Sequence, residues 1–331
     1  MIEKEHPEIK YGKTGVLVVN LGTPDSTSWW DIRKYLKEFL SDKRVIEVNP
    51  FVWQIILNLF ILTFRPSKTA HAYKKIWRKE SNESPLLFFT RSQAHKLKTV
   101  MESEKIIVDF AMRYGNPSIK FRLNMLKKAG CENIVILPLY PQYAGPTTAT
   151  VCDEVYRSLM GMRWQPSLQI IPHYESEPIY IHALINSIEK KIKEINWKPD
   201  LIISSYHGIP KSYFDKGDPY HCYCHKTTRL MKEKFDKIEI QTTFQSRFGP
   251  QEWLTPYTDK TLESLPGKGI KNLLVICPGF ASDCVETLEE INILGRDSFL
   301  KSGGKNFDLI PCLNDNPDHI TLLRHLINKY L

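Results

Sequence analysis

The amino-acid sequence predicts an α/β protein of two doubly wound, Rossmann-like lobes, each with a four-stranded parallel sheet flanked by helices. Eight apolar, β-branched runs recur along the chain with helix-length spacers between them. The runs are continuous rather than alternating, which is typical of strands buried on both faces of a parallel sheet. The 331 residues suffice for two domains, since a domain usually takes about 100–200 residues. Ligands bind at the carboxyl ends of such strands, so a cleft is expected between the lobes.

The elements follow one another as βα units in both halves of the chain. The predicted strands are 15–21, 106–112, 133–139 and 168–172 in the first half, and 201–206, 238–244, 272–277 and 307–311 in the second. Spacers with helical periodicity include 179–195, 226–235 and 283–294. The predicted domains are an N-terminal lobe, 1–175, and a C-terminal lobe, 176–331. The last helix, 319–330, is free to pack back on the first lobe.

Composition is typical of a folded, soluble protein. Apolar residues make up 42% of the chain and charged residues 25%, and the mean hydropathy of −0.31 excludes a polytopic membrane protein. A net charge of +8 indicates an acidic partner, whether a nucleic acid, a membrane surface or a small molecule. Seven scattered cysteines favour reduced thiols in a cytosolic chain over a disulfide framework. The polar first 11 residues contain no secretory signal pattern.

One uncharged apolar stretch, residues 51–64, differs from the rest of the chain, whose composition is typical of a soluble protein. It is too short to span a bilayer, which takes about 20 residues, and it contains Gln54 and Asn58. One interpretation is a buried core helix. The other is an element that dips into a membrane interface, because basic residues flank the stretch on both sides. Those basic residues are Lys43, Arg44, Arg65, Lys68, Lys74, Lys75, Arg78 and Lys79.

Reactive side chains follow several predicted strands. The clearest example is His207, which directly follows a predicted buried strand and precedes Gly208 and Pro210. It is either a structural residue at a strand end or a cleft residue whose imidazole takes a proton or holds a metal. Others at strand ends are Asn20, Arg113, Tyr114, Tyr140, Ser246 and Arg247.

An acidic row follows the strand at 272–277. Asp283, Glu286 and Glu290 are spaced i, i+3, i+7, which predicts that they share one helical face. The row is either a solvated acidic first turn favoured by the helix dipole or a set of carboxylates that abstract protons or carry a divalent cation.

Three further features of the sequence argue against a bound cofactor or a nucleic-acid partner. The segment 221–225 reads His-Cys-Tyr-Cys-His, but no second cysteine pair lies nearby, which argues against a zinc or iron–sulfur site. No Gly-x-Gly-x-x-Gly pattern follows any predicted strand, so a nucleotide-dependent enzyme is poorly supported. No groove-reading motif or long basic helix indicates nucleic-acid binding.

Taken together, the motifs resemble those of the ferrochelatase family, enzymes that insert Fe²⁺ into a porphyrin at the end of heme synthesis. The resemblance runs nearly end to end. Its blocks lie at 18–24, 84–86, 112–115, 139–143, 207–210, 217–220, 244–250, 253–254 and 282–288. It implies the same chelatase-like pair of α/β lobes with a cleft between them.

The resemblance also implies roles for particular residues. His207 and Glu286 match the catalytic pair across the cleft, and both could contact the metal, with Asp283 and Glu290 behind Glu286 as a path for metal or protons. The substrate-binding positions are Arg65, Tyr73, Ser84, Arg113, Tyr114, Tyr140 and Trp253. The membrane-facing lip within 51–64 comprises Phe51, Trp53, Ile56, Leu59 and Phe60.

The implied function is insertion of Fe²⁺ into protoporphyrin IX to give protoheme. Alternatives are a coproporphyrin ferrochelatase, a cobalt chelatase and, from another class, a non-catalytic bilobal porphyrin- or metal-binding protein. We expect no tightly bound cofactor and no iron–sulfur cluster, with Fe²⁺ as substrate. The expected location is the cytoplasm, peripherally on the inner face of the cytoplasmic membrane, and the oligomeric state is open. Cys284 stands where some family members have a second histidine, which weakens a histidine-based metal relay there.

Overall fold

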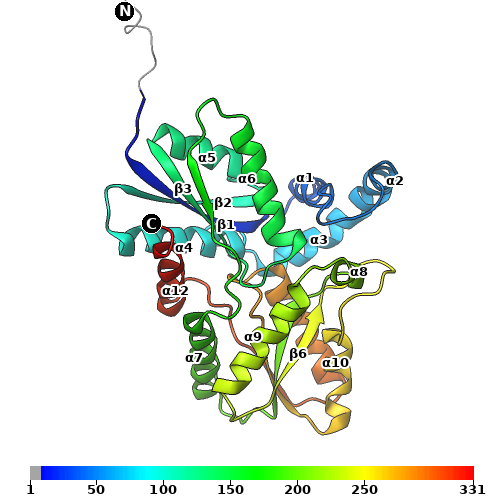
Figure 1. Cartoon of the computed structure of the whole chain (residues 1–331). Helices are drawn as coiled ribbons and strands as arrows, with labels where there is room; N and C mark the ends of the chain where they lie inside the picture. The colour runs from blue at the N-terminus through cyan, green and yellow to red at the C-terminus, as the bar shows by residue number, and fades with distance from the viewer. Residues whose placement is uncertain (1–8) are drawn as a thin grey trace, which may run out of the picture.

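The computed structural model describes residues 9–331 and contains two four-stranded parallel sheets, one in each lobe (Figure 1). The first has the order β2-β1-β3-β4. Its strands are β1 (Lys13–Thr23), β2 (Ile106–Gly115), β3 (Cys131–Pro138) and β4 (Ser167–Ile170). The second has the order β6-β5-β7-β8. Its strands are β5 (Leu201–His207), β6 (Ile240–Gln245), β7 (Asn272–Ile276) and β8 (Asn306–Leu309). The α/β class and all eight predicted strands are confirmed.

The central strand of each sheet is buried on both faces, which explains the continuous apolar runs. In β1, Val16 and Val18 pack with Leu97 of α4 (Pro85–Met101). Leu17 and Val19 point to the opposite face. That face is covered by α5 (Ile119–Lys128) and α6 (Thr150–Met160). Successive side chains of a strand point to opposite faces, so two covering layers require apolar residues at every position.

The second lobe repeats this arrangement. One face of its sheet packs against α7 (Pro178–Glu194) and α9 (Tyr220–Lys234). The other packs against α10 (Thr258–Ser264), α11 (Arg296–Lys301) and the π-helix η4 (Glu286–Gly295). Short elements complete the lobe: α8 (Lys211–Asp215) and η3 (Pro266–Lys268), with η2 (Gly145–Ala149) in the first lobe.

One apolar cluster joins the two lobes. It includes Leu97 of α4, Ile185 of α7 and Leu322 of α12 (Pro317–Asn328). The last helix therefore contacts both α4 and α7, and Figure 1 shows it beside α4. The domain boundary at 175/176 stays a prediction; β4 ends at Ile170 and β5 begins at Leu201.

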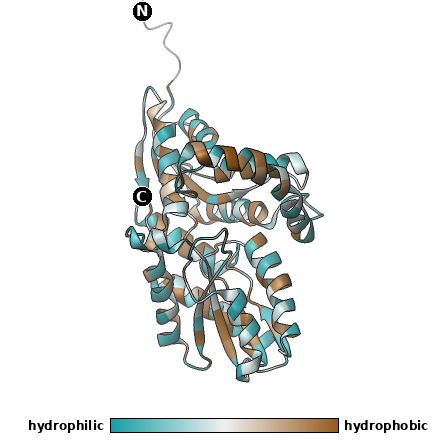
Figure 2. Cartoon of the chain, turned by 90° about the vertical axis from the view of Figure 1, so that its right-hand side faces the viewer, coloured by the Kyte–Doolittle hydropathy of each residue, from teal (hydrophilic) through white to brown (hydrophobic). Residues whose placement is uncertain are grey.

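The apolar stretch forms one helical arm after α1 (Trp29–Leu40). It runs through α2 (Pro50–Ile56), the π-helix η1 (Leu57–Ile61) and α3 (Leu62–Ile76). The interpretation as a buried core helix is wrong, because most of its large apolar side chains are exposed. The exposed ones are Phe51, Val52, Ile55, Ile56, Leu59, Phe60 and Phe64. Figure 2 shows much of this helical arm of the first lobe in brown, the colour of hydrophobic residues. None of the helices in residues 9–331 has the length and apolar character needed to cross a membrane.

Trp53 differs from the other four lip residues. Its indole Nε1–H donates to the Leu40 carbonyl oxygen at 2.6 Å, and its ring packs with the cluster beneath α1. Leu57 and Leu62 are also fully buried there. Trp53 therefore anchors the arm to α1, and the exposed apolar surface consists of its neighbours.

Candidate active-site cleft

His207 is the last residue of β5, at the carboxyl edge of the second sheet. Its Nδ1 lies 2.6 Å from the Gly208 carbonyl oxygen. A carbonyl only accepts, so Nδ1 carries the proton in this contact and the Nε2 lone pair is left available as a base or ligand. A Cβ atom on Gly208 would lie 2.9 Å from the Gln245 carbonyl oxygen and 3.2 Å from the Trp253 ring. Glycine therefore permits the turn that presents the imidazole.

Glu290 of η4 lies against the end of the neighbouring strand. Its carboxylate accepts hydrogen bonds from the Ser246 backbone N–H at 2.7 Å, from the Ser246 hydroxyl and from Gln245 Nε2 at 3.4 Å. Burial raises the pKa of Glu290 above its usual range, and the charge of Glu286 raises it further. The hydrogen bond from Ser246 and the charge of His207 act in the opposite direction and lower the pKa. Glu290 is thus within electrostatic reach of both predicted catalytic residues.

Glu286 begins η4 and faces phenols from the first lobe. Burial raises the pKa values of Tyr35 and Tyr73 well above the usual range, and the charge of Glu286 raises them further. Both phenols are buried and come from α1 and α3 respectively. They therefore stay protonated, and the Glu286 carboxylate lies where the two lobes meet, since η4 contacts α3.

Asp283 departs from the predicted row. It precedes the helix, which begins after it, and is buried. Its carboxylate accepts hydrogen bonds from Asn314 Nδ2 at 2.6 Å, the Thr287 hydroxyl at 3.1 Å and the Cys312 backbone N–H at 3.3 Å. The prediction of one shared helical face is wrong for Asp283, because the chain enters a π-helix with i→i+5 bonds only at Glu286. Asp283 instead fastens this loop to residues 312–314.

The part of the chain that the structure describes contains no preformed metal cage. Among residues 9–331, no three His, Cys, Asp or Glu side chains are placed together to hold a metal ion. His207 and Glu286 each influence Glu290 electrostatically, but the three side chains do not form a group that could hold a metal ion.

The opposite wall of the predicted cleft would consist of three predicted substrate residues, Arg113, Tyr114 and Tyr140, which are buried in this structure. Arg113 Nε donates to the Thr150 carbonyl oxygen and hydroxyl, both at 2.9 Å. Its guanidinium also pairs with Asp42, which accepts a second hydrogen bond from the Tyr114 hydroxyl at 2.9 Å. The buried Tyr140 hydroxyl has no hydrogen-bond partner within the described chain. Buried polar atoms are normally hydrogen-bonded, so this hydroxyl is left unsatisfied by the protein itself.

Asp42 and Thr150 were not identified from the sequence. Asp42 lies in the loop after α1, far along the chain from Arg113, and nothing in its local pattern sets it apart. Only the fold brings the carboxylate and the guanidinium together.

The predicted mouth of the cleft includes a cation and two aromatic rings. The Arg65 guanidinium of α3 lies 4.2 Å from the centre of the Phe248 ring, which belongs to the second lobe. Burial lowers the pKa of Arg65 below its usual range, and no carboxylate pairs with it in the part of the chain described. Trp253 Nε1–H donates to the Phe248 carbonyl oxygen at 3.0 Å. Arg65 is thus free to bind an anionic substituent.

Ser84 has a structural role in this conformation. Its hydroxyl accepts a hydrogen bond from the Leu87 backbone N–H at 3.2 Å and so caps the N-terminus of α4. It is fully buried. The structure therefore does not bring Ser84 together with Arg65 at an open surface.

The loop 41–49 bridges the two lobes, and we call it the strap. On the first lobe, Arg44 Nε pairs with Asp153 at 2.6 Å. On the second lobe, the Tyr213 hydroxyl donates to the Val45 carbonyl oxygen at 3.0 Å. The strap leads directly into the arm that carries the lip, so the position of the lip depends on both lobes.

All seven cysteines are free. Burial raises the pKa of Cys277, Cys284 and Cys312 well above the usual range, so these thiols are poor metal ligands at neutral pH. Cys224 is buried whereas Cys222 is exposed. The two therefore do not share one environment, and the absence of an iron–sulfur cluster stays a prediction.

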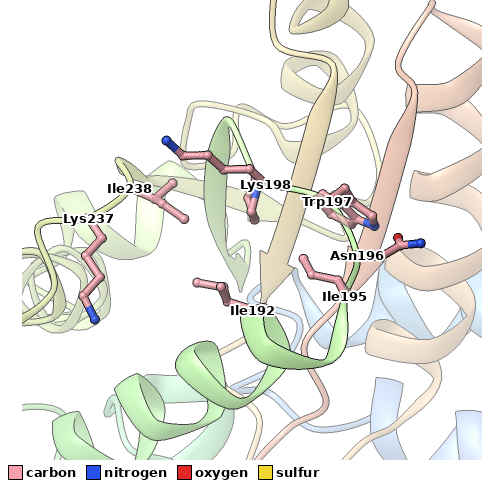
Figure 3. Close-up of a pocket in the computed structure, with 8 residues that line it drawn as sticks. Ile192, Ile195, Asn196, Trp197, Lys198, Lys237 and Ile238 are labelled. Atoms are coloured by element: carbon pink, nitrogen blue, oxygen red, sulfur yellow. The ribbon is translucent and has the colours of Figure 1, made fainter.

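A separate open groove of about 520 Å³ lies elsewhere on the second lobe (Figure 3). It is lined by the end of α7 and the segments that precede β5 and β6, including Ile195, Trp197, Lys198, Lys237 and Ile238. These segments lie at the amino ends of the strands, opposite His207. The groove contains none of the predicted site residues.

Known proteins resemble this chain over nearly its whole length. The family model described as Ferrochelatase matches residues 13–331. A ferrochelatase of Allorhizobium ampelinum is 53% identical over all of this chain and 97% of its own length. One of Rhizobium meliloti is 52% identical over 99% of this chain and 97% of its own length. One of Francisella tularensis subsp. novicida is 50% identical over 97% of this chain and 96% of its own length.

Solved structures of chelatases share the fold. SirB from Bacillus subtilis with Fe³⁺ has a TM-score of 0.57 at 13% identity, covering 96% of this chain and 95% of that one. CbiX is described as the terminal enzyme for biosynthesis of siroheme in denitrifying bacteria. It has a TM-score of 0.53 at 12% identity and covers 96% of this chain and 99% of its own. The match of the family model to nearly the whole chain and the half-identical relatives show that this chain belongs to the ferrochelatase family.

Proposed function

We propose that this chain, a metal chelatase of heme synthesis, binds protoporphyrin IX in the cleft between its lobes and inserts Fe²⁺ to give protoheme. The observation that carries the proposal is the available Nε2 of His207 at the edge of the second sheet, beside the carboxylate of Glu290. Fe²⁺ is a substrate here. The non-catalytic binding protein is not supported, because the half-identical relatives are named ferrochelatases.

The reaction replaces two pyrrole N–H protons with one Fe²⁺ and releases two protons. In the proposed mechanism His207 Nε2 accepts a pyrrole proton, and its Nδ1–H stays bonded to the Gly208 carbonyl oxygen. Glu290 takes the proton onward, because burial raises its pKa above its usual range and so makes it a better proton acceptor. Glu286, at the meeting of the lobes, serves as the second base or as a ligand while Fe²⁺ sheds its water.

The opposite wall and the mouth hold the macrocycle. Tyr114 and Tyr140 supply the first-lobe wall, and the Arg113–Asp42 pair keeps that wall rigid. Arg65 is free to bind a propionate, with Tyr73 buried deeper on the same helix. Trp253 and Phe248 offer flat surfaces to the ring. Binding energy at the edges would drive the bending that exposes the pyrrole nitrogens.

We also propose that the chain is a cytoplasmic protein that associates peripherally with the inner face of the cytoplasmic membrane through the lip. Phe51 is 84% exposed, and Ile56, Leu59 and Phe60 are exposed beside it. Exposed apolar side chains next to lysines such as Lys68 and Lys74 suit an anionic lipid surface. Such a surface also favours protoporphyrin over coproporphyrin, because each additional propionate must be solvated.

An anaerobic assay of Fe²⁺ insertion, with protoporphyrin and coproporphyrin in parallel, tests the proposal. We expect metallated product with protoporphyrin as the preferred substrate. A preference for coproporphyrin would reassign the substrate, and a preference for Co²⁺ over Fe²⁺ would reassign the metal. Absence of product with either porphyrin would refute the catalytic proposal.

A further inference from the structure

Two histidines at the start of α9 are not used by the proposed reaction. His221 and His225 are four positions apart in the sequence, and their ring centres lie 4.4 Å apart. Side chains at i and i+4 are neighbours on a helix surface. Two histidines at this spacing on one helix face are a recurrent way to bind a transition metal. The two cysteines between them do not complete a four-ligand metal site. Cys224 is buried, and Cys222, although exposed, directly follows His221 in the sequence and so does not face it on the helix.

Aromatic packing orients both imidazole rings. The His221 ring meets Phe214 edge-on at 5.2 Å and stacks on Phe244 at 5.9 Å. The His225 ring lies 6.0 Å from the same Phe244 ring. Within residues 9–331, neither imidazole forms a hydrogen bond with the protein. Aromatic contacts therefore fix the position of both rings, and their ring nitrogen atoms remain available as metal ligands.

The electrostatic setting favours the ligand form of both rings. Burial lowers the pKa of His221 and of His225 below the usual range, and the positive charge of His221 lowers that of His225 further. A lowered pKa favours the neutral form of each imidazole, which has a lone pair to donate. Lys232 adds positive charge near His225, which weakens cation binding without occupying a ring nitrogen.

We propose that His221 and His225 form a two-histidine site for a borderline divalent metal ion on the exposed surface of α9. Water would complete the coordination. Neutral nitrogen ligands suit Zn²⁺, Ni²⁺ and Cu²⁺, and the general order of stability places Fe²⁺ below all three. The site is therefore distinct in chemistry from the carboxylate-rich cleft and would hold metals other than the iron that is inserted.

Titration of the full chain with Zn²⁺ against a chromophoric zinc chelator at neutral pH tests this site. The measurement is made in a His207→Ala background, so that the cleft does not contribute the signal. We expect His221→Gln and His225→Gln each to weaken Zn²⁺ binding roughly tenfold or more, because losing one of two ligands removes the chelate advantage. His182→Gln, at an exposed histidine of α7, is the matched control and should change nothing.

Two outcomes would overturn the assignment. One is a background protein that binds no Zn²⁺, or that binds it equally tightly after either substitution in the pair. The other is a loss in Cys222→Ser as large as that in His225→Gln, which would make the exposed thiol a principal ligand. His225 is exposed, so His225→Gln decides the question even if His221→Gln does not fold.

Discussion

The Arg113 guanidinium and the Asp42 carboxylate form a buried ion pair that joins the strap to strand β2 of the first lobe. The Tyr114 hydroxyl donates to the same carboxylate at 2.9 Å. One acidic side chain therefore fixes two of the residues that the sequence assigned to substrate binding. The carboxylate of Asp42 neutralises the charge of Arg113. Arg65, at the predicted mouth of the cleft, pairs with no carboxylate in the described residues, so it is the cation available to bind a propionate.

Removal of the Asp42 carboxylate is expected to destabilise the protein strongly. Asp42→Ala leaves Arg113 buried without a counter-charge, and breaking one side of a buried pair costs about 3–5 kcal/mol. Urea unfolding of purified protein measures the change. Asp153→Ala breaks the more exposed pair with Arg44 and should cost less than about 1 kcal/mol. Equal losses in the two variants would contradict the buried role of Asp42.

Substitution of Glu290 is expected to lower activity without unfolding the chain. Glu290→Gln removes the carboxylate beside His207, and loss of a general acid–base group typically costs about 10²-fold or more in rate. The anaerobic insertion assay gives the rate. The matched control is Glu289→Gln, on the same helix, where the carboxylate pairs with Lys75 at 3.0 Å. Similar rates in the two variants would exclude Glu290 from the proton path.

A methyl group at position 208 is expected to displace the catalytic imidazole. In Gly208→Ala the added Cβ would lie 2.9 Å from the Gln245 carbonyl oxygen, and such overpacking costs about 1–3 kcal/mol. We expect lower stability together with a loss of insertion rate. Gly267→Ala, where the Cβ meets no atom within 4 Å, should leave both quantities near the wild-type values. Full activity in Gly208→Ala would show that the turn tolerates the shift.

Acid sensitivity is expected to depend on His319 of α12. This side chain is fully buried, and burial lowers its pKa to about 4 from the usual 6.5. The unfolded chain therefore binds more protons than the folded one between these values, so stability falls as the pH drops from 6.5 to 4 and is flat below. The loss amounts to about 3 kcal/mol.

The pH dependence of urea unfolding checks this contribution. His319→Gln should flatten the slope in that window, whatever its effect at neutral pH. The exposed His182 is the control, and His182→Gln should keep the wild-type slope. An unchanged slope in His319→Gln would assign the acid sensitivity to other groups.

Binding to anionic vesicles is expected to depend on the lip. Phe51→Ser and Phe60→Ser each remove an exposed ring from the arm and should weaken co-sedimentation roughly fivefold or more. Higher salt should weaken wild-type binding as well, because it screens the flanking lysines. Phe121→Ser alters an exposed ring on α5 and is the control. Equal binding by all variants would remove the lip from membrane association.

The sequence by itself determined the two sheets and the position of His207. Strands covered on both faces must be apolar at every position, so each of the eight runs was visible without knowledge of its neighbours. His207 could be placed because a strand end followed by glycine is a local feature. The family motifs are also read along the chain and therefore needed no coordinates.

Only the tertiary structure decided the pairing of Asp42 with Arg113, the separation of Asp283 from the helix and the exposure of the lip. The first joins residues 71 positions apart, so no local pattern encodes it. The second depends on where the π-helix begins, which the 3.6-residue period does not predict. The third could not be read from hydropathy, because an apolar helix looks the same whether protein or another surface covers it.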